Sequence, residues 1–383
     1  MAVTPAETSL PVPPHLSDAT LRDSAHMAGV EFKSHDAAEI ARLLVRTGID
    51  LVEVGMISGP GSKDAALIEA THEAIGPERS MTLVVVRDRH QVATALDEAA
   101  RLGVRHIMYS IPTSEQHAKL KLDSPSAKLL HVVARSAISQ AKDRGFHVTF
   151  SGEDGARTPG ERLVPYVEAG FDAGADRFRL AETVAYLSPW QMEKVISDIT
   201  AIDGSEIEIH SHNMLGMAVA NSLAAVRAGA RWISATVGGI GERGGNAPLA
   251  ELLTALRVIH DDRRFDLTHL TELSRLALRG AGLGEAFQSG PTTPHAFAYE
   301  LPGQLLHPEA YETLPAELVG NTRELRVRTR LTGALVRWAL DDSGVVVDID
   351  AFTPWLVTRQ EAAGAPLLDR DAIRKAAVDF QNI

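Results

Sequence analysis

The chain alternates short runs of β-branched and aromatic residues with longer stretches in which apolar residues recur every three or four positions. The short runs predict buried strands, and the longer stretches predict amphipathic helices that pack against them. Strands are predicted at residues 15–21, 49–55, 81–86, 104–111, 147–154, 177–183, 206–213 and 231–240. Helical stretches follow them, the eighth over roughly residues 247–260, and several end in Gly, which suits a left-handed helix end. This repetition predicts an α/β protein with a (β/α)8 TIM barrel; a doubly wound sheet is the alternative, without a GxGxxG motif after the first strand to support it.

The repetition of strands and helices ends after about residue 265. At the other end of the chain, the N-terminal segment MAVTPAETSLPVPP is rich in Pro and small residues. It lacks the basic start and the apolar block of a secretory signal. Gly and Pro are frequent over 281–320, which indicates a linker, and helical patterns return afterwards. We therefore expect a flexible leader over 1–14, the barrel over 15–265, a linker subdomain over 266–320 and a helical C-terminal subdomain over 321–383. Helices of this last part are predicted at 323–340, 348–361 and 369–381.

Composition narrows the class of protein. Hydrophobic residues make up 45% of the 383 positions, enough for a large core. No apolar run approaches the roughly 20 residues that cross a bilayer. The 38 Lys and Arg against 50 Asp and Glu give a net charge of −12, so a nucleic-acid partner is not expected. There is no Cys, so a metal would be held by His, Asp, Glu or Asn. A cytoplasmic enzyme without a membrane partner is expected.

The segment EIEIHSHN at 206–213 carries the most specific chemistry. Alternate residues of a strand point to one face, so His210 and His212 should project side by side as half of a divalent-metal site. Two histidines satisfied at a strand end are the structural alternative. Barrel closure brings the seventh, eighth and first strands together, so Asp23 after the first strand and Asn246 in the loop GGIGERGGN should approach them. These four residues predict a site for Mn²⁺, Mg²⁺ or Zn²⁺ with positions open for substrate.

Other roles for the same residues stay open. Asp23 suits a helix N-cap or an ion pair with Arg22, and Asn246 suits a cap on the helix that begins NAPLAELL. The Gly-rich loop also suits contact with a phosphorylated carrier such as coenzyme A. It lacks the Lys-Ser/Thr pair of a P-loop, so nucleotide hydrolysis is not expected.

The segment LSDATLRDSAHMAGVEF resembles the DxTLRDGxQ signature of the metal-dependent Claisen-condensing and aldol-cleaving barrels. This group contains isopropylmalate, citramalate and homocitrate synthases, hydroxymethylglutaryl-CoA lyase and 4-hydroxy-2-oxovalerate aldolase. The resemblance continues in VEVG at 52–55, FSGED at 150–154, AETV at 181–184, HSHN at 210–213, AVANSLAAVRAGA at 218–230, GIGERGGNAPL at 239–249 and HPEAYETLPAELVGNTR at 307–323. It covers most of residues 16–330.

Within this group, the chain is most similar to the synthases. SGED with Glu153, the Glu-Arg pair in GERGGN and Tyr311 in PEAYE resemble synthase motifs, and the length suits the build of a homocitrate synthase without a feedback domain. DSAHMAGVEF looks closest to the synthases of phosphonate and phosphinate antibiotic pathways, which make phosphonomethylmalate or phosphinomethylmalate. The resemblance implies an acyltransferase that condenses acetyl-CoA with a 2-oxo acid, and a homodimer. A metal-dependent aldolase or lyase, with His26 as its base, is the alternative.

The resemblance also implies roles for residues at the strand ends. Arg22 is expected to hold the carbonyl or carboxylate of the 2-oxo acid, with an ion pair to a carboxylate such as Glu153 as the structural alternative. Thr183 is expected to bond the substrate carboxylate, or to pack as a β-branched residue. Glu153 is the leading candidate for the base that removes a methyl proton from acetyl-CoA. His26 and Tyr311 follow, with substrate orientation and packing in the cap as their alternatives.

The expected acceptor carries a second anionic group. Glu53 and His106 are expected to contact the substrate. His106 and His117 are placed near the end of the fourth strand, where this family binds the distal part of the 2-oxo acid, although surface histidines are common in such loops. Arg105, His106 and Lys63 would suit a second anion, as in 2-oxoglutarate, oxaloacetate or phosphonopyruvate.

Some positions depart from the family pattern. Ser24–His26 replace the usual Gly-Glu-Gln, and Glu182 stands where Asp is usual. The synthases' cap histidine has no clear counterpart, because the expected position holds Glu300, and His295 and His307 are the nearest alternatives. These departures concern the acid–base residues and the identity of the 2-oxo acid.

Overall fold

The computed structural model describes residues 10, 12–85, 89–122, 126–202, 204–284, 287, 290–293, 296–327 and 331–382. The chain divides into two compact units, with the boundary between residues 289 and 290. Most of the predicted leader lies outside the described residues, and the predicted boundaries at 266 and 321 stay predictions. No helix among the described residues is long and apolar enough to cross a membrane.

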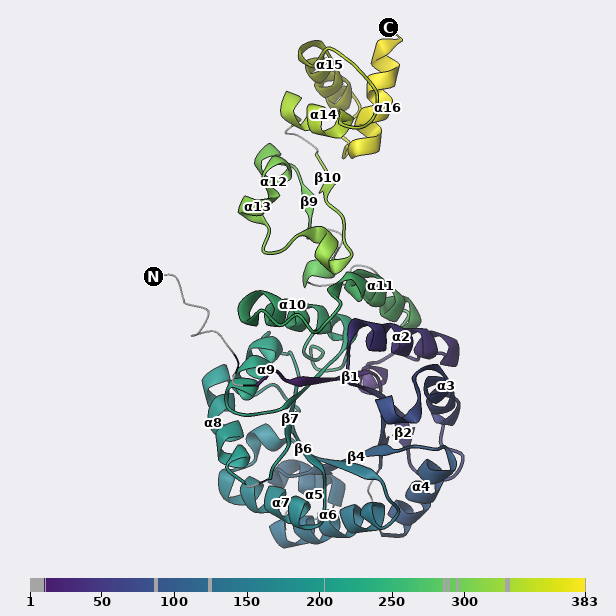
Figure 1. Cartoon of the computed structure of the whole chain (residues 1–383), viewed down its shortest axis with the longest axis vertical. Helices are drawn as coiled ribbons and strands as arrows, with labels where there is room; N and C mark the ends of the chain where they lie inside the picture. The colour runs from purple at the N-terminus through teal and green to yellow at the C-terminus, as the bar shows by residue number, and fades with distance from the viewer. Residues whose placement is uncertain are drawn as a thin grey trace. The chain divides into compact units, whose positions relative to one another are not determined.

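The first unit is a closed barrel of parallel strands, in which each strand pairs with the next and the last pairs with the first (Figure 1). The strands are β1 (His15–Leu21), β2 (Leu51–Ile57), β3 (Ser80–Val84), β4 (His106–Pro112), β5 (His147–Glu153), β6 (Arg177–Glu182), β7 (Ile207–Ser211) and β8 (Trp232–Ala235). The predicted TIM barrel is confirmed. The eighth strand is shorter than predicted, because a 3-10 turn at Val237–Gly239 follows it with Gly238 in the left-handed region (φ 62°).

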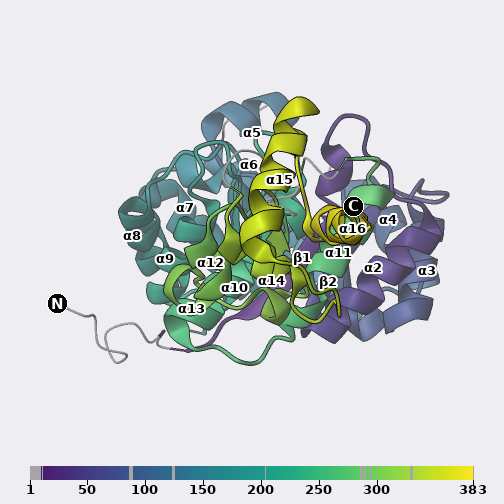
Figure 2. The same ribbon diagram turned by 90° about the horizontal axis from the view of Figure 1, so that it is seen from above.

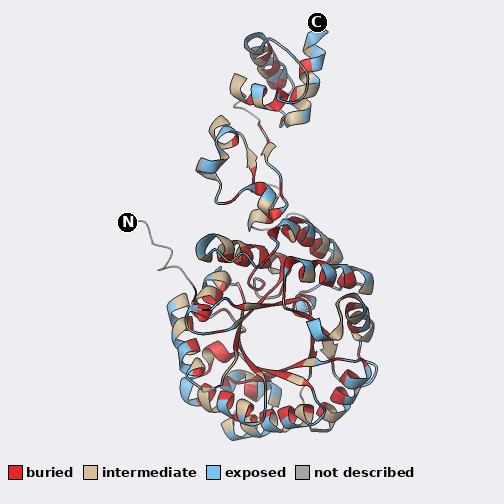
Figure 3. Ribbon diagram, viewed as in Figure 1, coloured by how far each residue is buried: buried red, intermediate tan, exposed pale blue. Residues whose placement is uncertain are grey.

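Helices lie around the outside of the strands in sequence order (Figures 1 and 2). They are α2 (Ser34–Thr47), α3 (Ala65–Ile75), α4 (Arg89–Arg101), α5 (Glu115–Leu122), α6 (Ala127–Lys142), α7 (Gly160–Asp172), α8 (Pro189–Thr200), α9 (Ala218–Arg227), α10 (Leu249–His260) and α11 (Leu270–Gly280). The strands are buried along their length, while the helices bury one face and expose the other (Figure 3).

Helix α2 shows how the sequence sets these elements. Ile40 and Leu44 lie four positions apart and are fully buried, as expected for the apolar face of an amphipathic helix. The helix ends at Gly48, which adopts a left-handed conformation with φ of 102° and donates its N–H to the carbonyls of Leu44 and Val45. Glycine adopts this conformation without the steric cost that a side chain would add.

The second unit has its own small core. Its elements are β9 (Ala298–Tyr299), α12 (Pro302–Leu306), α13 (Pro308–Tyr311), β10 (Glu324–Leu325), α14 (Gly333–Leu340), α15 (Ile349–Ala362) and α16 (Arg370–Gln381). Val336, Phe352 and Ile373 from the last three helices are buried together. The helix predicted from residue 323 was wrong in its first part, because residues 324–325 pair with β9 and α14 begins only after Thr332, whose hydroxyl accepts the N–H of Leu335.

The contact between α7 and β5 leaves no room for a side chain at Gly170. Phe150 of β5 is fully buried and packs against Tyr166 of α7 and Phe178 of β6, with ring centroids 5.6 and 5.0 Å apart. A Cβ atom at Gly170 would lie 2.2 Å from the Phe150 ring. Close packing in protein interiors makes such an overlap costly.

We expect Gly170→Ala to destabilise the protein by about 1–3 kcal/mol, since overpacking outweighs the better helix propensity of Ala. Gly160→Ala, at the start of the same helix, is the control, because a Cβ there meets nothing within 4 Å. That control should change stability by less than about 1 kcal/mol. Denaturant unfolding measures both, and equal stabilities of the two variants would contradict this account of the packing.

Candidate active site and metal centre

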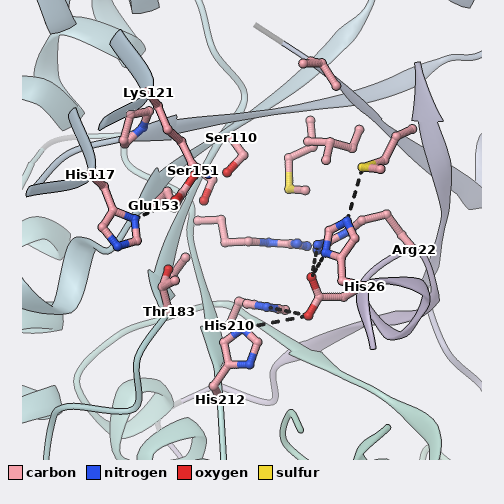
Figure 4. Close-up of a pocket in the computed structure, with 18 of the residues that line it drawn as sticks. Arg22, His26, Ser110, His117, Lys121, Ser151, Glu153, Thr183, His210 and His212 are labelled. Carbon is pink, nitrogen blue, oxygen red and sulfur yellow. Dashed lines mark hydrogen bonds and ion pairs between the residues drawn. The ribbon is translucent and has the colours of Figure 1, made fainter. Parts of the chain in front are cut away.

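A cavity of about 870 Å³ opens at the carboxyl ends of the barrel strands (Figure 4). Its lining includes Asp23 after β1, Glu153 at the end of β5, Thr183 after β6 and His212 after β7. Residues on strands of a TIM barrel converge at this end, so side chains far apart in sequence meet here.

Asp23, His210 and His212 come together at one side of the cavity. Their ligand atoms lie within 4.8 Å of one another, and all three residues are buried. Asp23 Oδ2 is 3.5 Å from His210 Nε2 and 3.9 Å from His212 Nε2. The two imidazole rings stand nearly perpendicular, at 84°. A carboxylate and two imidazoles suit a first-row transition metal or Mg²⁺.

Neighbouring groups orient both imidazoles and fix the tautomer of His212. His212 Nδ1 faces the carbonyl oxygens of Gly245 at 3.2 Å and Glu242 at 3.3 Å, so it carries the hydrogen and leaves a lone pair on Nε2. His210 Nδ1 lies 2.9 Å from the hydroxyl of Ser234, its register partner on β8. Burial and the neighbouring His210 lower the pKa of His212 to about 3. Neutral imidazoles with Nε2 lone pairs are the form that binds a metal.

Asn246 adds an amide to this group. Its Nδ2 is 2.9 Å from Asp23 Oδ2 and 3.2 Å from His210 Nε2, while its buried Oδ1 has no hydrogen-bond partner among the described residues. The loop that places it needs glycine at residue 245, where φ is 86° and a Cβ would lie 1.9 Å from the carbonyl oxygen of Gly239. The carboxylate and the two imidazoles fit a divalent cation, and the side chain of Asn246 would offer its oxygen to that cation with the amide group turned over, since Nδ2 is the atom that faces Asp23 and His210.

The structure also bears on the other roles considered for these residues. Asp23 Oδ1 does pair with Arg22 Nη1. Burial alone would raise the pKa of Asp23, but Arg22 and His210 hold that pKa well below its usual value. The N-cap of α10 is Pro248, two residues after Asn246. Arg243 Nη2 lies 2.9 Å from His212 Nε2, so a metal at this nitrogen would displace the arginine.

The carboxylate of Glu53 on β2 holds the guanidinium of Arg22. Its Nε and Nη2 donate to Glu53 Oε2 at 2.9 and 2.7 Å. Glu53 Oε1 accepts from Arg179, which also binds Glu208 at 2.8 Å. Burial alone would raise the pKa of Glu53. Arg179 and Arg22 lower it by more than burial raises it, so the pKa lies below its usual value and the carboxylate is charged. Glu53 is 1% exposed and is absent from the described cavity lining, so its contact with a substrate stays a prediction, while its bonds to Arg22 are present.

Glu153 lines another side of the cavity, with His117 and Lys121 of α5 beside it (Figure 4). His117 Nδ1 lies 2.7 Å from Glu153 Oε1, and Lys121 Nζ lies 2.7 Å from Oε2. The ion pair between Arg22 and Glu153, considered as the structural alternative for Arg22, is not formed among the described residues. Arg22 pairs with Glu53, and Glu153 pairs with His117 and Lys121. The hydroxyl of Thr183 accepts the N–H of Asp154 at 2.9 Å and lines the same cavity.

His26 also lines the cavity, close to the Asp23 side. Its Nδ1 is 3.6 Å from Asp23 Oδ1, and its Nε2 is 3.4 Å from the sulfur of Met56. Tyr311 closes α13 of the second unit, but its side chain lies outside the described residues, as does all of His295. His307 of the second unit is exposed and lies 3.5 Å from Glu309.

The expected placement of His106 in the site was wrong. His106 begins β4, so it lies at the amino-terminal end of the barrel, away from the cavity. There its ring lies 4.8 Å from the ring of His147, its register partner on β5, at a tilt of 47°, and its Nε2 lies 3.7 Å from Glu78. Arg105 approaches the same Glu78, and Lys63 pairs with the exposed Glu31, so neither provides a cation in the cavity.

Comparisons with known proteins agree with this geometry. The HMGL-like family model matches residues 13–277. The chain belongs to the HMGL-like family. It is 34% identical over 337 residues to a 2-phosphonomethylmalate synthase of Streptomyces rubellomurinus, covering 86% of this chain and 88% of that protein. It is 35% identical over 346 residues to homocitrate synthase AksA of Methanopyrus kandleri, covering 88% and 85%.

The fold of this HMGL-like enzyme is also found in solved structures. HMG-CoA lyase from Bacillus subtilis superposes with a TM-score of 0.62, at 19% identity, over 72% of this chain and 96% of the lyase. At this identity the likeness concerns the barrel fold alone. Relatives found by sequence also include 2-isopropylmalate synthase 2 of Caldanaerobacter subterraneus, 32% identical over 318 residues, covering 82% of this chain and 81% of that protein.

Several site residues of this HMGL-like chain escaped the sequence analysis. Arg179, Ser234 and Lys121 touch Glu53, His210 and Glu153, but no motif marked them. The spacing of His117 and Lys121 was the one available signal, because residues four apart share a helix face. Glu182 was noted as unusual, and its buried carboxylate binds Asn221 and the N–H of Leu187, which fixes the loop after β6.

Loss of a metal ligand should remove metal binding. We expect His210→Ala and His212→Ala to bind Mn²⁺ at least about 10–100-fold more weakly than the EDTA-treated parent protein, measured by calorimetric titration. His35→Ala is the control, because His35 is exposed and pairs with Glu39 outside the cavity. Circular dichroism shows whether the variants stay folded. Folded variants with the parent's affinity would contradict the metal centre.

Proposed function

We propose that this enzyme condenses acetyl-CoA with a 2-oxo acid to give a 2-hydroxy-2-carboxymethyl acid and free CoA. The observation that carries the proposal is that one cavity is lined both by Asp23, His210 and His212 and by the carboxylate of Glu153. The first group suits a cation that activates a carbonyl, and the second suits a base for a methyl proton. The synthase names of the relatives support this choice.

The acceptor would bind between the ligand group and two further donors. A divalent cation held by Asp23, His210, His212 and Asn246 would polarise the acceptor carbonyl and stabilise negative charge on its oxygen. Arg22 lines the cavity and is held by Glu53, so its remaining N–H groups would donate to the carbonyl or carboxylate of the 2-oxo acid.

Thr183 is a donor to the acceptor carboxylate in this proposal. Its oxygen already accepts the N–H of Asp154, so the hydroxyl proton is left to donate. Arg243 Nε donates to the carbonyl of Thr183 at 2.6 Å, which holds this residue in place. A role of Thr183 in packing alone would require neither the bond from Asp154 nor the bond from Arg243.

Glu153 is the proposed base. It would take a proton from the methyl group of acetyl-CoA, and the resulting enolate carbon would bond to the acceptor carbonyl carbon. Hydrolysis of the thioester by water then releases CoA as a thiol. His26 and Tyr311 stay the next candidates for acid–base help, and His26 lines the cavity.

The proposed acceptor is dianionic, such as oxaloacetate, 2-oxoglutarate or phosphonopyruvate. The name of the Streptomyces rubellomurinus relative supports a phosphonate, and that of the Methanopyrus kandleri relative supports a second carboxylate. The cations first expected to bind this group lie outside the cavity, but Lys121 lines it. The homodimer and the cytoplasmic location stay predictions.

The direct test follows thiol release from acetyl-CoA with a panel of 2-oxo acids. We expect release with at least one acid, loss of release in EDTA and recovery with Mn²⁺ or Mg²⁺, because the acceptor carbonyl needs the cation. Glu153→Gln should lower the rate by about 10²–10⁴-fold, as for loss of a general base. A thiol reagent measures the rate.

Glu161→Gln on the exposed face of α7 is the matched control and should keep the parent's rate. Thiol release that is indifferent to EDTA would contradict the proposal. Formation of pyruvate from 4-hydroxy-2-oxovalerate without any thiol release would establish the aldolase alternative instead, with His26 as the base to examine.

A further inference from the structure

Lys121 is the one lysine among the described residues that line the cavity. It lies in the last turn of α5, and its ammonium donates to Glu153 Oε2 at 2.7 Å (Figure 4). His117, one turn earlier, holds Oε1 at 2.7 Å. Each oxygen of the proposed base is therefore bound by a nitrogen of the same helix.

The other cations of the cavity have more than one partner. Arg22 binds Glu53 and Asp23, and Arg179 binds Glu53 and Glu208. Arg243 contacts Glu242 and the carbonyl of Thr183. These buried or partly buried guanidiniums form a fixed frame.

Lys121 is different, because its side chain is 57% exposed while that of Glu153 is 13% exposed. An ion pair made by an exposed lysine contributes little net stability, so the lysine can exchange its carboxylate partner for another anion at small cost. Its flexible four-carbon stem lets the ammonium change partner without a change in the helix.

The bond from Lys121 also affects what Glu153 can do. While the ammonium is bonded to Oε2, it occupies the approach that a proton of the acetyl methyl group would need. With both oxygens occupied, the carboxylate is poorly prepared to take a proton from a methyl group. His117 is suited to stay bonded to Oε1, because its Nε2 also lies 3.5 Å from Arg157 Nη2 and 3.8 Å from Asp154 Oδ2, which hold the ring in place.

We propose that the second anionic group of the acceptor draws the ammonium of Lys121 away from Glu153. Lys121 would thereby select dianionic 2-oxo acids and free Oε2 of Glu153 when such an acid is bound. This inference rests on the proposed synthase function. Lys121 is a positioning and specificity residue in this scheme and stays protonated throughout.

The freed oxygen then takes part in one balanced step. A C–H bond of the acetyl methyl group breaks, its proton forms an O–H bond with Glu153 Oε2, and the electron pair stays on the enolate. Before the acceptor arrives, the ammonium suppresses this proton transfer. Acetyl-CoA is therefore not turned into an enolate that has no acceptor to attack.

The first test compares acceptors. We expect Lys121→Met to lower kcat/KM for oxaloacetate and phosphonopyruvate about 10–100-fold relative to pyruvate and 3-methyl-2-oxobutanoate, which lack the second anion. The loss should lie mainly in KM of the dianionic acids. Lys121→Arg keeps the charge and should recover part of the selectivity.

The second test follows exchange of the acetyl-CoA methyl protons in D₂O with Mg²⁺ and without acceptor, by mass spectrometry. We expect slow exchange in the parent and exchange at least about 10-fold faster in Lys121→Met, whose Glu153 has lost the charged hydrogen bond. Lys119→Met, exposed on the same helix and absent from the described cavity lining, is the control for both tests.

The outcomes separate this inference from the synthase proposal. Thiol release in the parent, together with selectivity and exchange in Lys121→Met equal to those of Lys119→Met, would overturn the role of Lys121 and leave the synthase standing. A change in selectivity without faster exchange would overturn the release of Glu153. Absence of thiol release with every acid in the parent would overturn both proposals.

Discussion

The shared carboxylate of Glu53 is the contact on which the site depends. One oxygen binds Arg179 from β6, and the other binds Arg22 after β1, which in turn binds Asp23. Arg177 and Glu208 extend this network to three arginines and three carboxylates, all buried. Ions in a protein interior cost several kcal/mol each unless they are paired, so every member needs its partners. The network therefore fixes the position of Arg22 and Asp23 through charge.

The two histidines are likewise held by hydrogen bonds with neighbouring groups. The carbonyls of Glu242 and Gly245 take the Nδ1 hydrogen of His212, and Ser234 binds Nδ1 of His210. Ser234 also lies 3.4 Å from Glu53 Oε1, so the histidine is linked to the arginine network. Such second contacts set the direction and protonation of ligand imidazoles. These contacts orient the two rings toward Asp23.

The sequence predicted much of this arrangement. Alternation within EIEIHSHN placed His210 and His212 on one face, and barrel closure brought Asp23 to them, because both arguments need only periodicity and strand order. The partner of Glu53 could not be predicted in this way, since β2 and β6 meet across the barrel interior and their contacts depend on strand tilt and stagger. His106 was misplaced because it begins its strand, while the cavity lies at the strand ends.

The most direct test of the network is the Mn²⁺ affinity of Glu53→Gln, measured by calorimetric titration beside Glu78→Gln, an exposed glutamate near the other end of the barrel. We expect binding about 10–100-fold weaker than in the parent, because Arg22 and Asp23 lose their support while every metal ligand remains. If Glu53→Gln does not fold, the Mn²⁺ affinity of Arg22→Lys tests the same network. Affinity equal to that of the parent in folded Glu53→Gln would contradict the claim that this buried carboxylate organises the metal centre.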